Sequence, residues 1–357
     1  MSLGILSLVG RTPLVKLERI FRHHKIEFFA KLEQCNPGGS TKDRPALRII
    51  RMGLESGAIQ PDTTIIESSS GNMGIGLAQV CLYHQLRFIC VVDPKTTAQN
   101  IALLKAYGAG IEMVDKPDPA TGEYLPARIQ RVKELVETVA NSFWPNQYAN
   151  EQNSEAHHET MREIVMELGK SIDFLFCATS TCGTLRGCSE YIKTHGLKTK
   201  VMAVDAVGSA IFSGHKCSRL IPGHGASIVP SLFRSDLVDR CIHVTDLDCV
   251  VGCHRLAYEE ALLAGGSSGG IVTAIEQSAS AMLDKAVCVA IFPDRGERYL
   301  DTVYCEEWVA EHFGEVPTLW NNDLRRARAL DRPDRPESEC RSASFQGERI
   351  GGQLRVR

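Results

Sequence analysis

The chain has 357 residues, of which 43% are hydrophobic and 23% are charged, and its formal net charge at pH 7 is −3. This composition indicates a globular protein of one large or two ordinary domains and gives no electrostatic case for binding nucleic acid or a membrane surface. No apolar run reaches the roughly 18 residues of a membrane span, and the N-terminus lacks a secretory signal pattern. The 13 cysteines are scattered without metal-ligand spacing. We therefore expect a cytoplasmic protein with reduced thiols and no bound metal.

Short apolar runs alternate with longer helical patterns along most of the chain. Strands are predicted at residues 27–32, 64–67, 88–92, 110–114, 174–178, 200–205 and 286–292. Helical patterns cover residues 76–84, 98–107, 127–140 and 153–168. This alternation predicts an α/β fold in which parallel sheets are covered by helices.

A tight turn precedes one lysine at the start of a helical pattern. Residues 36–41 read Asn-Pro-Gly-Gly-Ser-Thr, and Lys42 follows directly. A turn rich in glycine and proline fixes the direction of the lysine side chain. Taken alone, Lys42 is either a solvated residue near a helix start or an amine placed to form a Schiff base with an aldehyde cofactor.

Three further loops combine glycine with hydroxyl side chains at helix boundaries. Residues 67–76 (Glu-Ser-Ser-Ser-Gly-Asn-Met-Gly-Ile-Gly) and residues 179–187 (Thr-Ser-Thr-Cys-Gly-Thr-Leu-Arg-Gly) each follow a predicted strand. The N–H groups and the dipole of a helix start favour anions, so we interpret the first loop as a carboxylate site and the second as a phosphate cradle. Residues 265–270 (Gly-Gly-Ser-Ser-Gly-Gly) interrupt a helical run. Ordinary helix caps are the alternative, although a cap needs fewer such residues. Together with Lys42, these loops suggest pyridoxal phosphate and an amino-acid substrate.

The order and wording of these loops resemble the fold type II pyridoxal-phosphate enzymes of the cysteine synthase and cystathionine β-synthase group. The resemblance runs from residues 10–14 (Gly-Arg-Thr-Pro-Leu) to residues 292–300 (Phe-Pro-Asp-Arg-Gly-Glu-Arg-Tyr-Leu). It implies a two-domain α/β fold of the tryptophan synthase β type, pyridoxal 5′-phosphate as cofactor, and a homodimer. The implied large cofactor-binding domain comprises residues 1–40 and 150–325, and residues 41–149 form a small mobile domain. We expect the charged, proline-bearing tail at 331–357 to be disordered.

The resemblance also implies roles for individual residues. Lys42 would hold the cofactor as an internal aldimine and act as acid and base at the substrate Cα, Asn72 would hydrogen-bond the cofactor 3′-oxygen, and Ser267 would face the pyridine nitrogen. A hydroxyl does not hold a proton on that nitrogen as a carboxylate would, which suits β-elimination. The cofactor phosphate would be bound by Ser180, Thr181, Cys182, Gly183 and Thr184. The substrate carboxylate would be bound by Ser69, Ser70, Gly71, Asn72, Met73 and Gln147, with Tyr148 beside them.

Several positions depart from the sulfhydrylases of this group. Met73 replaces a threonine, Tyr148 replaces a phenylalanine, and Ser180 replaces a glycine, either as a substrate-selecting hydroxyl or as a tolerated change. His224 is either a polar group near the mouth of the active site or a surface residue. The longer segment at 115–135 is similar to the branch that contains N-(2-amino-2-carboxyethyl)-L-glutamate synthase, which serves 2,3-diaminopropionate supply for staphyloferrin B-type siderophores. Cations would help to hold the substrates of such an enzyme, and the candidates, each with a plain structural alternative, are Arg128, Arg131, Arg186 and Arg219.

The predicted function is a β-replacement. O-phospho-L-serine would lose phosphate to give an aminoacrylate, to which the amine of L-glutamate would add. The alternative within the class is a cysteine or S-sulfocysteine synthase that uses O-acetylserine or O-phosphoserine with sulfide or thiosulfate. A catalytically inert, metabolite-binding scaffold is the alternative from another class, and the presence of Lys42, Asn72 and Ser267 argues against it.

Overall fold

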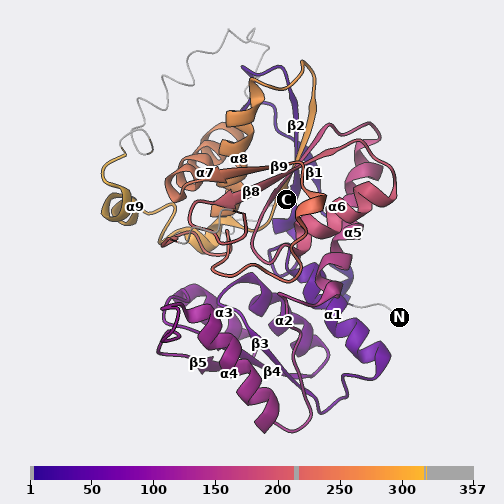
Figure 1. Cartoon of the computed structure of the whole chain (residues 1–357), viewed down its shortest axis with the longest axis vertical. Coiled ribbons are helices and arrows are strands. Elements are labelled where there is room, and N and C mark those ends of the chain that lie inside the picture. Colours follow the sequence, from indigo (N-terminus) through magenta and orange to yellow (C-terminus); the bar gives the residue numbers. More distant parts are fainter. Residues whose placement is uncertain (1–3, 213–216, 317–318, 320–357) are drawn as a thin grey trace, which may run out of the picture. The chain divides into compact units, whose positions relative to one another are not determined.

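The strands of the chain form two separate sheets with helices packed against them (Figure 1). The computed structural model describes residues 4–212, 217–316 and 319. The larger sheet has the order β1-β2-β10-β7-β8-β9, and the smaller has the order β5-β4-β3-β6. Within each sheet every neighbouring pair is parallel except β1 with β2. The α/β fold with parallel-rich sheets flanked by helices is therefore confirmed.

The larger sheet comprises β1 (Leu14–Lys16), β2 (Glu27–Leu32), β7 (Phe174–Ala178), β8 (Lys200–Ala206), β9 (Arg240–Val244) and β10 (Val287–Phe292). The smaller sheet comprises β3 (Thr64–Ser68), β4 (Arg87–Val92), β5 (Gly110–Met113) and β6 (Ser142–Phe143). The α-helices are α1 (Asp43–Ser56), α2 (Asn72–Tyr83), α3 (Ala98–Ala106), α4 (Tyr124–Thr138), α5 (Glu151–Leu168), α6 (Gly183–Thr194), α7 (Asp246–Glu260), α8 (Gly266–Ala279) and α9 (Glu306–Phe313). Short 3₁₀ turns are η1 (Gly4–Leu8), η2 (Glu33–Cys35), η3 (Ser235–Leu237) and η4 (Gly296–Tyr299).

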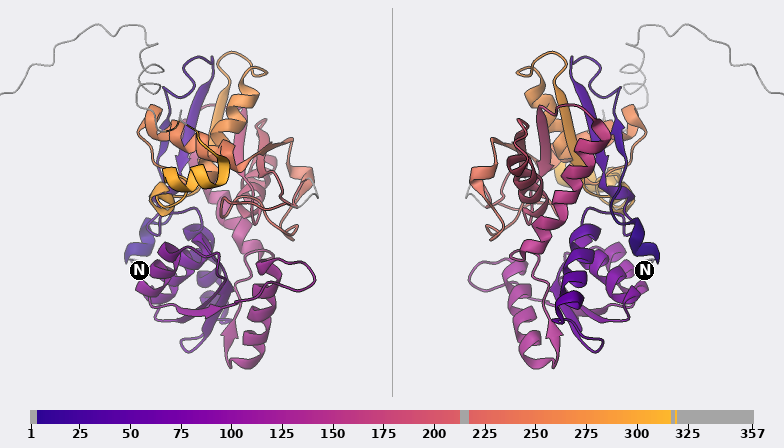
Figure 2. Two further views of the ribbon diagram at one scale, coloured as in Figure 1. Left: turned by 90° about the vertical axis from the view of Figure 1, so that its left-hand side faces the viewer. Right: turned by 90° about the vertical axis from the view of Figure 1, so that its right-hand side faces the viewer.

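Each sheet has its own hydrophobic core. Strands β3 and β4 pack against α1, α2 and α3 through side chains such as Ile50, Ile65 and Leu77, which are at most 1% exposed. The cluster at the larger sheet includes Leu175 and Val289, which are both fully buried. Both views of Figure 2 show residues 64–143 lying together, apart from the strands of the larger sheet. Removing such side chains from water supplies the main driving force for packing the helices against each sheet.

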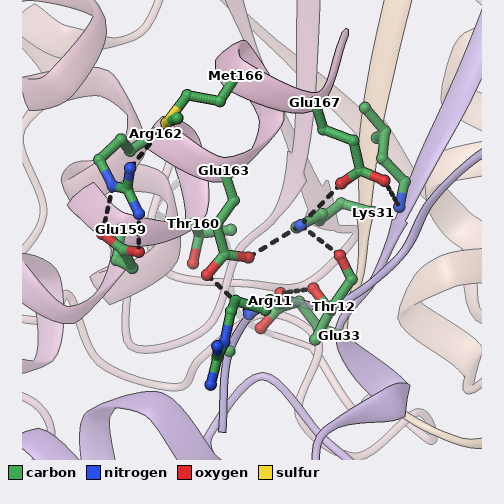
Figure 3. A network of polar contacts seen from close by, with 12 residues as sticks. Arg11, Thr12, Lys31, Glu33, Glu159, Thr160, Arg162, Glu163, Met166 and Glu167 are labelled. Atoms are coloured by element: carbon green, nitrogen blue, oxygen red, sulfur yellow. Dashed lines mark hydrogen bonds and ion pairs between the residues drawn. The ribbon is translucent and has the colours of Figure 1, made fainter. Parts of the chain in front are cut away.

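A buried cluster of charged side chains joins the start of α1 to the larger sheet. Arg44 donates hydrogen bonds to Glu33 (Nε to Oε2, 2.7 Å) and to Glu163 of α5 (Nη2 to Oε2, 2.7 Å). Lys31 of β2 lies 2.9 Å from the Glu163 carboxylate and donates to the backbone carbonyl of Thr12 (Figure 3). The four charged side chains are at most 8% exposed, and their formal charges cancel. Because buried charges are tolerated when they are paired and hydrogen-bonded, this cluster fixes the start of α1 against β2 and α5.

The chain through Val316 forms one compact unit. The predicted division into a large domain (1–40 and 150–325) and a small mobile domain (41–149) stays a prediction, and the proposed tail at 331–357 lies outside the described residues. Among the helices of the described ranges, none combines the length and the apolar character needed to cross a membrane.

Candidate active site

A cavity of about 1110 Å³ brings together the four loops that the sequence singled out. Its walls come from the start of α1, the loops that follow β3, β7 and β10, the start of α8, and segments 121–128 and 217–227. Several of these loops leave the carboxyl ends of parallel strands, where α/β folds commonly place their ligands. The predicted site residues that line the cavity are Lys42, Ser69, Ser70, Gly71, Asn72, Met73, Gln147, Tyr148, Ser180, Thr181, Cys182, Gly183, Thr184 and Ser267.

Lys42 lies at the N-terminal boundary of α1 and is half-buried in the cavity wall. Its direction is set by the preceding turn, in which Gly39 has a φ of +83° that only glycine adopts readily. Burial lowers the pKa of the Lys42 amine, and the negative charge of Asp294 opposes this shift. A lowered pKa increases the fraction of neutral amine, which is the form that can react with an aldehyde or accept a proton.

The loop at 69–73 is held by its own side chains as it enters α2. Ser69 Oγ accepts a hydrogen bond from the backbone N–H of Gly74 (2.9 Å). A Cβ on Gly71 would meet no atom within 4 Å, so the backbone there is open to a ligand. The Met73 side chain is 2% exposed and packs in the core of the smaller sheet, which accounts physically for an apolar residue at this position.

Asn72 contacts residues that the sequence reasoning did not select. Its Nδ2 donates to Asp294 Oδ2 (2.7 Å), and its Oδ1 accepts from Arg298. The hydroxyl of Tyr299 donates to the same Asp294 oxygen (2.5 Å). Asp294, Arg298 and Tyr299 lie in residues 292–300, the last stretch of sequence that resembles the family, directly after β10. The position of this stretch after a buried strand is the sequence signal that could have indicated its role in the site.

The phosphate cradle is the turn between β7 and the start of α6. Cys182 has a φ of +64°, which reverses the chain into the helix. A Cβ on Gly183 would lie 2.2 Å from Asn153 Oδ1, so any larger residue there would require the Asn153 side chain to move. The Thr184 hydroxyl lies 3.2 Å from Nε2 of His157. Burial lowers the pKa of His157 well below its usual range, so this ring adds no positive charge.

These residues fit a phosphorylated pyridoxal ring. The start of a 12-residue helix offers N–H groups and a positive dipole end to a phosphate. In addition, Thr41 and Ser68 are among the residues that line the cavity, and their hydroxyl oxygens are buried without a hydrogen-bond partner among the described residues. Buried polar atoms are nearly always satisfied in folded proteins, so these two hydroxyls favour a polar ligand beside Lys42.

The doubled glycines before and after Ser267 have a packing role. A Cβ on Gly252 of α7 would lie 2.0 Å from the carbonyl oxygen of Gly269 in α8. The two helices therefore touch through their backbones, and this contact sets where the first turn of α8 presents Ser267 to the cavity. Ser267 itself is 7% exposed.

The four candidate arginines separate into two groups. Arg128 and Arg219 line the cavity. Arg128 is 8% exposed and lies 3.0 Å from Asp93. Arg131 and Arg186 do not line it. Arg131 pairs with Glu112 of β5 and Glu134 of α4, and Arg186 pairs with Glu151 of α5 and Glu190 of α6.

His224 is not on the surface, so that alternative was wrong, and it does not itself line the cavity, although Gly223 and Gly225 on either side of it do. It is fully buried, its Nε2 lies 3.1 Å from the carbonyl oxygen of Val204, and its Nδ1 lies 3.4 Å from Cys249 Sγ. Burial lowers the pKa of the ring. Within the described residues, no group of three or more His, Cys, Asp or Glu side chains is placed to hold a metal ion.

Comparison with known proteins gives a consistent result. A family model described as pyridoxal-phosphate dependent enzyme matches residues 5–294. A hydrogen sulfide-producing enzyme from Fusobacterium nucleatum is 31% identical, with a TM-score of 0.79 over 84% of this chain and 100% of that one. The O-acetylserine dependent cystathionine β-synthase of Helicobacter pylori is 31% identical, with a TM-score of 0.79 over 84% of this chain and 98% of that one. O-ureido-L-serine synthase is 29% identical, with a TM-score of 0.79 over 90% and 98%. The chain therefore belongs to the pyridoxal-phosphate dependent enzyme family, as a fold type II β-substituted alanine synthase of the cysteine synthase type.

Proposed function

We propose that the chain exchanges the phosphate of O-phospho-L-serine for the amine of L-glutamate, giving N-(2-amino-2-carboxyethyl)-L-glutamate. When bound, pyridoxal phosphate supplies an electron sink that stabilises negative charge at the substrate Cα. The observation that carries the proposal is the presence of two guanidinium groups, those of Arg128 and Arg219, in the wall of the cavity that contains Lys42.

The residues around the cavity have distinct roles in this proposal. Lys42 holds the cofactor, takes the proton from Cα and later returns it, as its lowered pKa favours. The backbone N–H groups of residues 69–73 bind the substrate carboxylate at the start of α2, together with Gln147. The turn at 180–184 holds the cofactor phosphate, and Ser267 faces the pyridine nitrogen.

Charge favours these two substrates over smaller ones. A phosphate ester and a dicarboxylate together carry more negative charge than O-acetylserine and sulfide. Arg128 can contribute a donor to an anion, because its Nη1 has no hydrogen-bond partner among the described residues, whereas its Nε is paired with Asp93 (3.0 Å). The hydroxyl-bearing residues Ser180 and Tyr148 line the same cavity and add hydrogen-bond donors.

A sulfur nucleophile is the second candidate. The similar Helicobacter structure is described as O-acetylserine dependent, and the similar Fusobacterium enzyme as hydrogen sulfide-producing. By this alternative, the chain would be a cysteine or S-sulfocysteine synthase that uses sulfide or thiosulfate.

The deciding experiment measures phosphate release from O-phosphoserine by the cofactor-loaded protein, with glutamate, sulfide, thiosulfate or no nucleophile. We expect release that depends on glutamate, with the adduct identified by mass spectrometry. Turnover with sulfide or thiosulfate alone would refute the glutamate assignment.

Two arginines on α4 provide a matched pair of variants. Arg128→Met should raise the half-saturating concentration of O-phosphoserine or of glutamate by roughly tenfold or more, because a charge-assisted contact is lost. Arg131→Met changes the same residue type three positions along the helix, outside the cavity, and should leave both concentrations unchanged. Equal effects of the two substitutions would contradict the role given to Arg128.

A further inference from the structure

Glu67 lies behind the cavity wall, near the end of β3. It is 1% exposed and is not among the residues that line the cavity. Its carboxylate accepts hydrogen bonds from the backbone N–H of Ser68 (2.8 Å), the backbone N–H of Gln147 (3.1 Å) and the indole N–H of Trp144 (3.2 Å). A single buried carboxylate therefore binds two segments that lie 80 residues apart.

Those two segments are the ones proposed to bind the substrate carboxylate. Ser68 leads directly into the loop at 69–73, and Gln147 is the other residue proposed to bind the carboxylate. The side-chain amide of Gln147 also donates to the carbonyl oxygen of Ser68 (2.9 Å). The loop and Gln147 are thus tied together at the end of β3, and Glu67 holds the backbone of both.

We propose that Glu67 is a positioning residue, which holds the loop at 69–73 and Gln147 in the arrangement that binds the α-carboxylate of the amino-acid substrate. This inference rests on the proposed function only in that these segments bind that carboxylate, and it is independent of the leaving group and of the nucleophile. The negative charge matters because an ionised carboxylate accepts from all three donors, whereas an amide or a protonated carboxyl turns a donor toward one of them.

The surroundings of Glu67 place its ionisation near neutral pH. The titratable groups that influence it or are influenced by it are Arg128 from α4, the thiol of Cys90 from β4, and the Tyr148 hydroxyl. Burial raises the pKa of Glu67 to about 7, against the opposing effects of its hydrogen bonds and of the Arg128 charge. Substrate affinity should therefore increase as the pH rises through this value and the carboxylate forms.

The experiment compares the parent holoenzyme with Glu67→Gln and Trp144→Phe. The first measurement is the concentration of O-phosphoserine or O-acetylserine that half-saturates the change in the cofactor's visible spectrum, as a function of pH. The second is hydrogen–deuterium exchange of the backbone amides of residues 68–73 and 146–148. Cofactor affinity serves as the control, because the turn at 180–184, which would hold the cofactor phosphate, takes part in none of the three hydrogen bonds.

We expect Glu67→Gln to raise the half-saturating concentration roughly tenfold at pH 8, through the loss of charge-assisted hydrogen bonding, and to reduce its dependence on pH. Exchange at Ser68 and Gln147 should be faster in this variant. Trp144→Phe removes one donor to the carboxylate and should move the pH midpoint upward, which a purely structural role for Glu67 would not produce.

Two outcomes would overturn the inference: parent-like substrate affinity and pH profile in Glu67→Gln, or parent-like exchange at residues 68 and 147. Burial also raises the pKa of Asp43 to about 7. If substrate affinity in Glu67→Gln kept the pH dependence of the parent, that dependence would be attributed to Asp43. If neither amino acid alters the spectrum of the parent, the proposed function fails, and the exchange measurement still tests the positioning role.

Discussion

Replacing Arg44 with methionine removes one of the two positive charges from the buried cluster at the start of α1. Arg44 is 5% exposed, and its removal leaves the carboxylates of Glu33 and Glu163 with Lys31 as the cluster's remaining cation. Breaking a buried ion pair by removing one partner costs about 3–5 kcal/mol. For a chain of this size we expect the thermal midpoint, followed by circular dichroism, to fall by roughly 5–10 °C.

Arg162→Met is the matched control. Arg162 is on α5 beside Glu163 and forms a still shorter contact with Glu159 (2.5 Å), but both side chains are nearly half exposed. Exposed ion pairs contribute little to stability, so this variant should unfold close to the parent midpoint. The difference between Arg44→Met and the parent should also narrow as the pH falls toward about 4, where protonation neutralises an unpaired glutamate. Equal midpoints for the two variants, or a difference that is independent of pH, would refute the reasoning.

Three further predictions follow from the site and the cluster. Lys42→Ala should abolish the visible absorption band that the parent shows with pyridoxal phosphate, and a variant that keeps the parent band would contradict the role of Lys42. Thr184→Val should weaken cofactor binding roughly tenfold by loss of a hydroxyl donor. As a control, Thr160→Val removes the hydroxyl beside the other ring nitrogen of His157, outside the cavity, and should leave cofactor affinity unchanged. If both variants lost the same affinity, the effect would come from His157 and not from a contact between Thr184 and the cofactor. Burial raises the pKa of Glu163, but the hydrogen bonds and charge of Arg44 outweigh it and lower the pKa from 4.5 to about 2. The stability that this ionisation contributes should be present above pH 4.5 and be lost as the pH falls toward 2, and acid titration of the thermal midpoint that shows no decline in this window would contradict it.

The sequence predicted most of the architecture because its signals are local. Strands 27–32 and 174–178 have the predicted bounds, and the loops after β3 and β7 carry glycine and hydroxyl residues where a strand turns into a helix. Strands β1, β6 and β9 were not predicted. They are short or lie at sheet edges, where few apolar residues are needed.

The remaining features depend on contacts between distant parts of the chain. Asn72 meets Asp294 across 222 positions, and a local pattern carries no information about such a pairing. From the sequence alone, Lys31 and Glu33 would be assigned to the surface, because a charged residue is buried only when it has a partner. Arg128 and Arg131 lie three positions apart on one helix, and only the packing of α4 shows which of them reaches the cavity.

The backbone contact between α7 and α8 makes the active site sensitive to changes at residues that do not line the cavity. Neither Gly252 nor Gly269 can accept even a methyl group unless the helices separate, since a Cβ on either would lie 2.0 Å from a carbonyl oxygen. Alanine at either glycine therefore acts on the first turn of α8, and so on Ser267, without touching a ligand. Random mutagenesis should find that these two glycines tolerate substitution as poorly as residues that line the cavity. A map of the substitutions that abolish activity would therefore include the contact between α7 and α8 as well as the cavity.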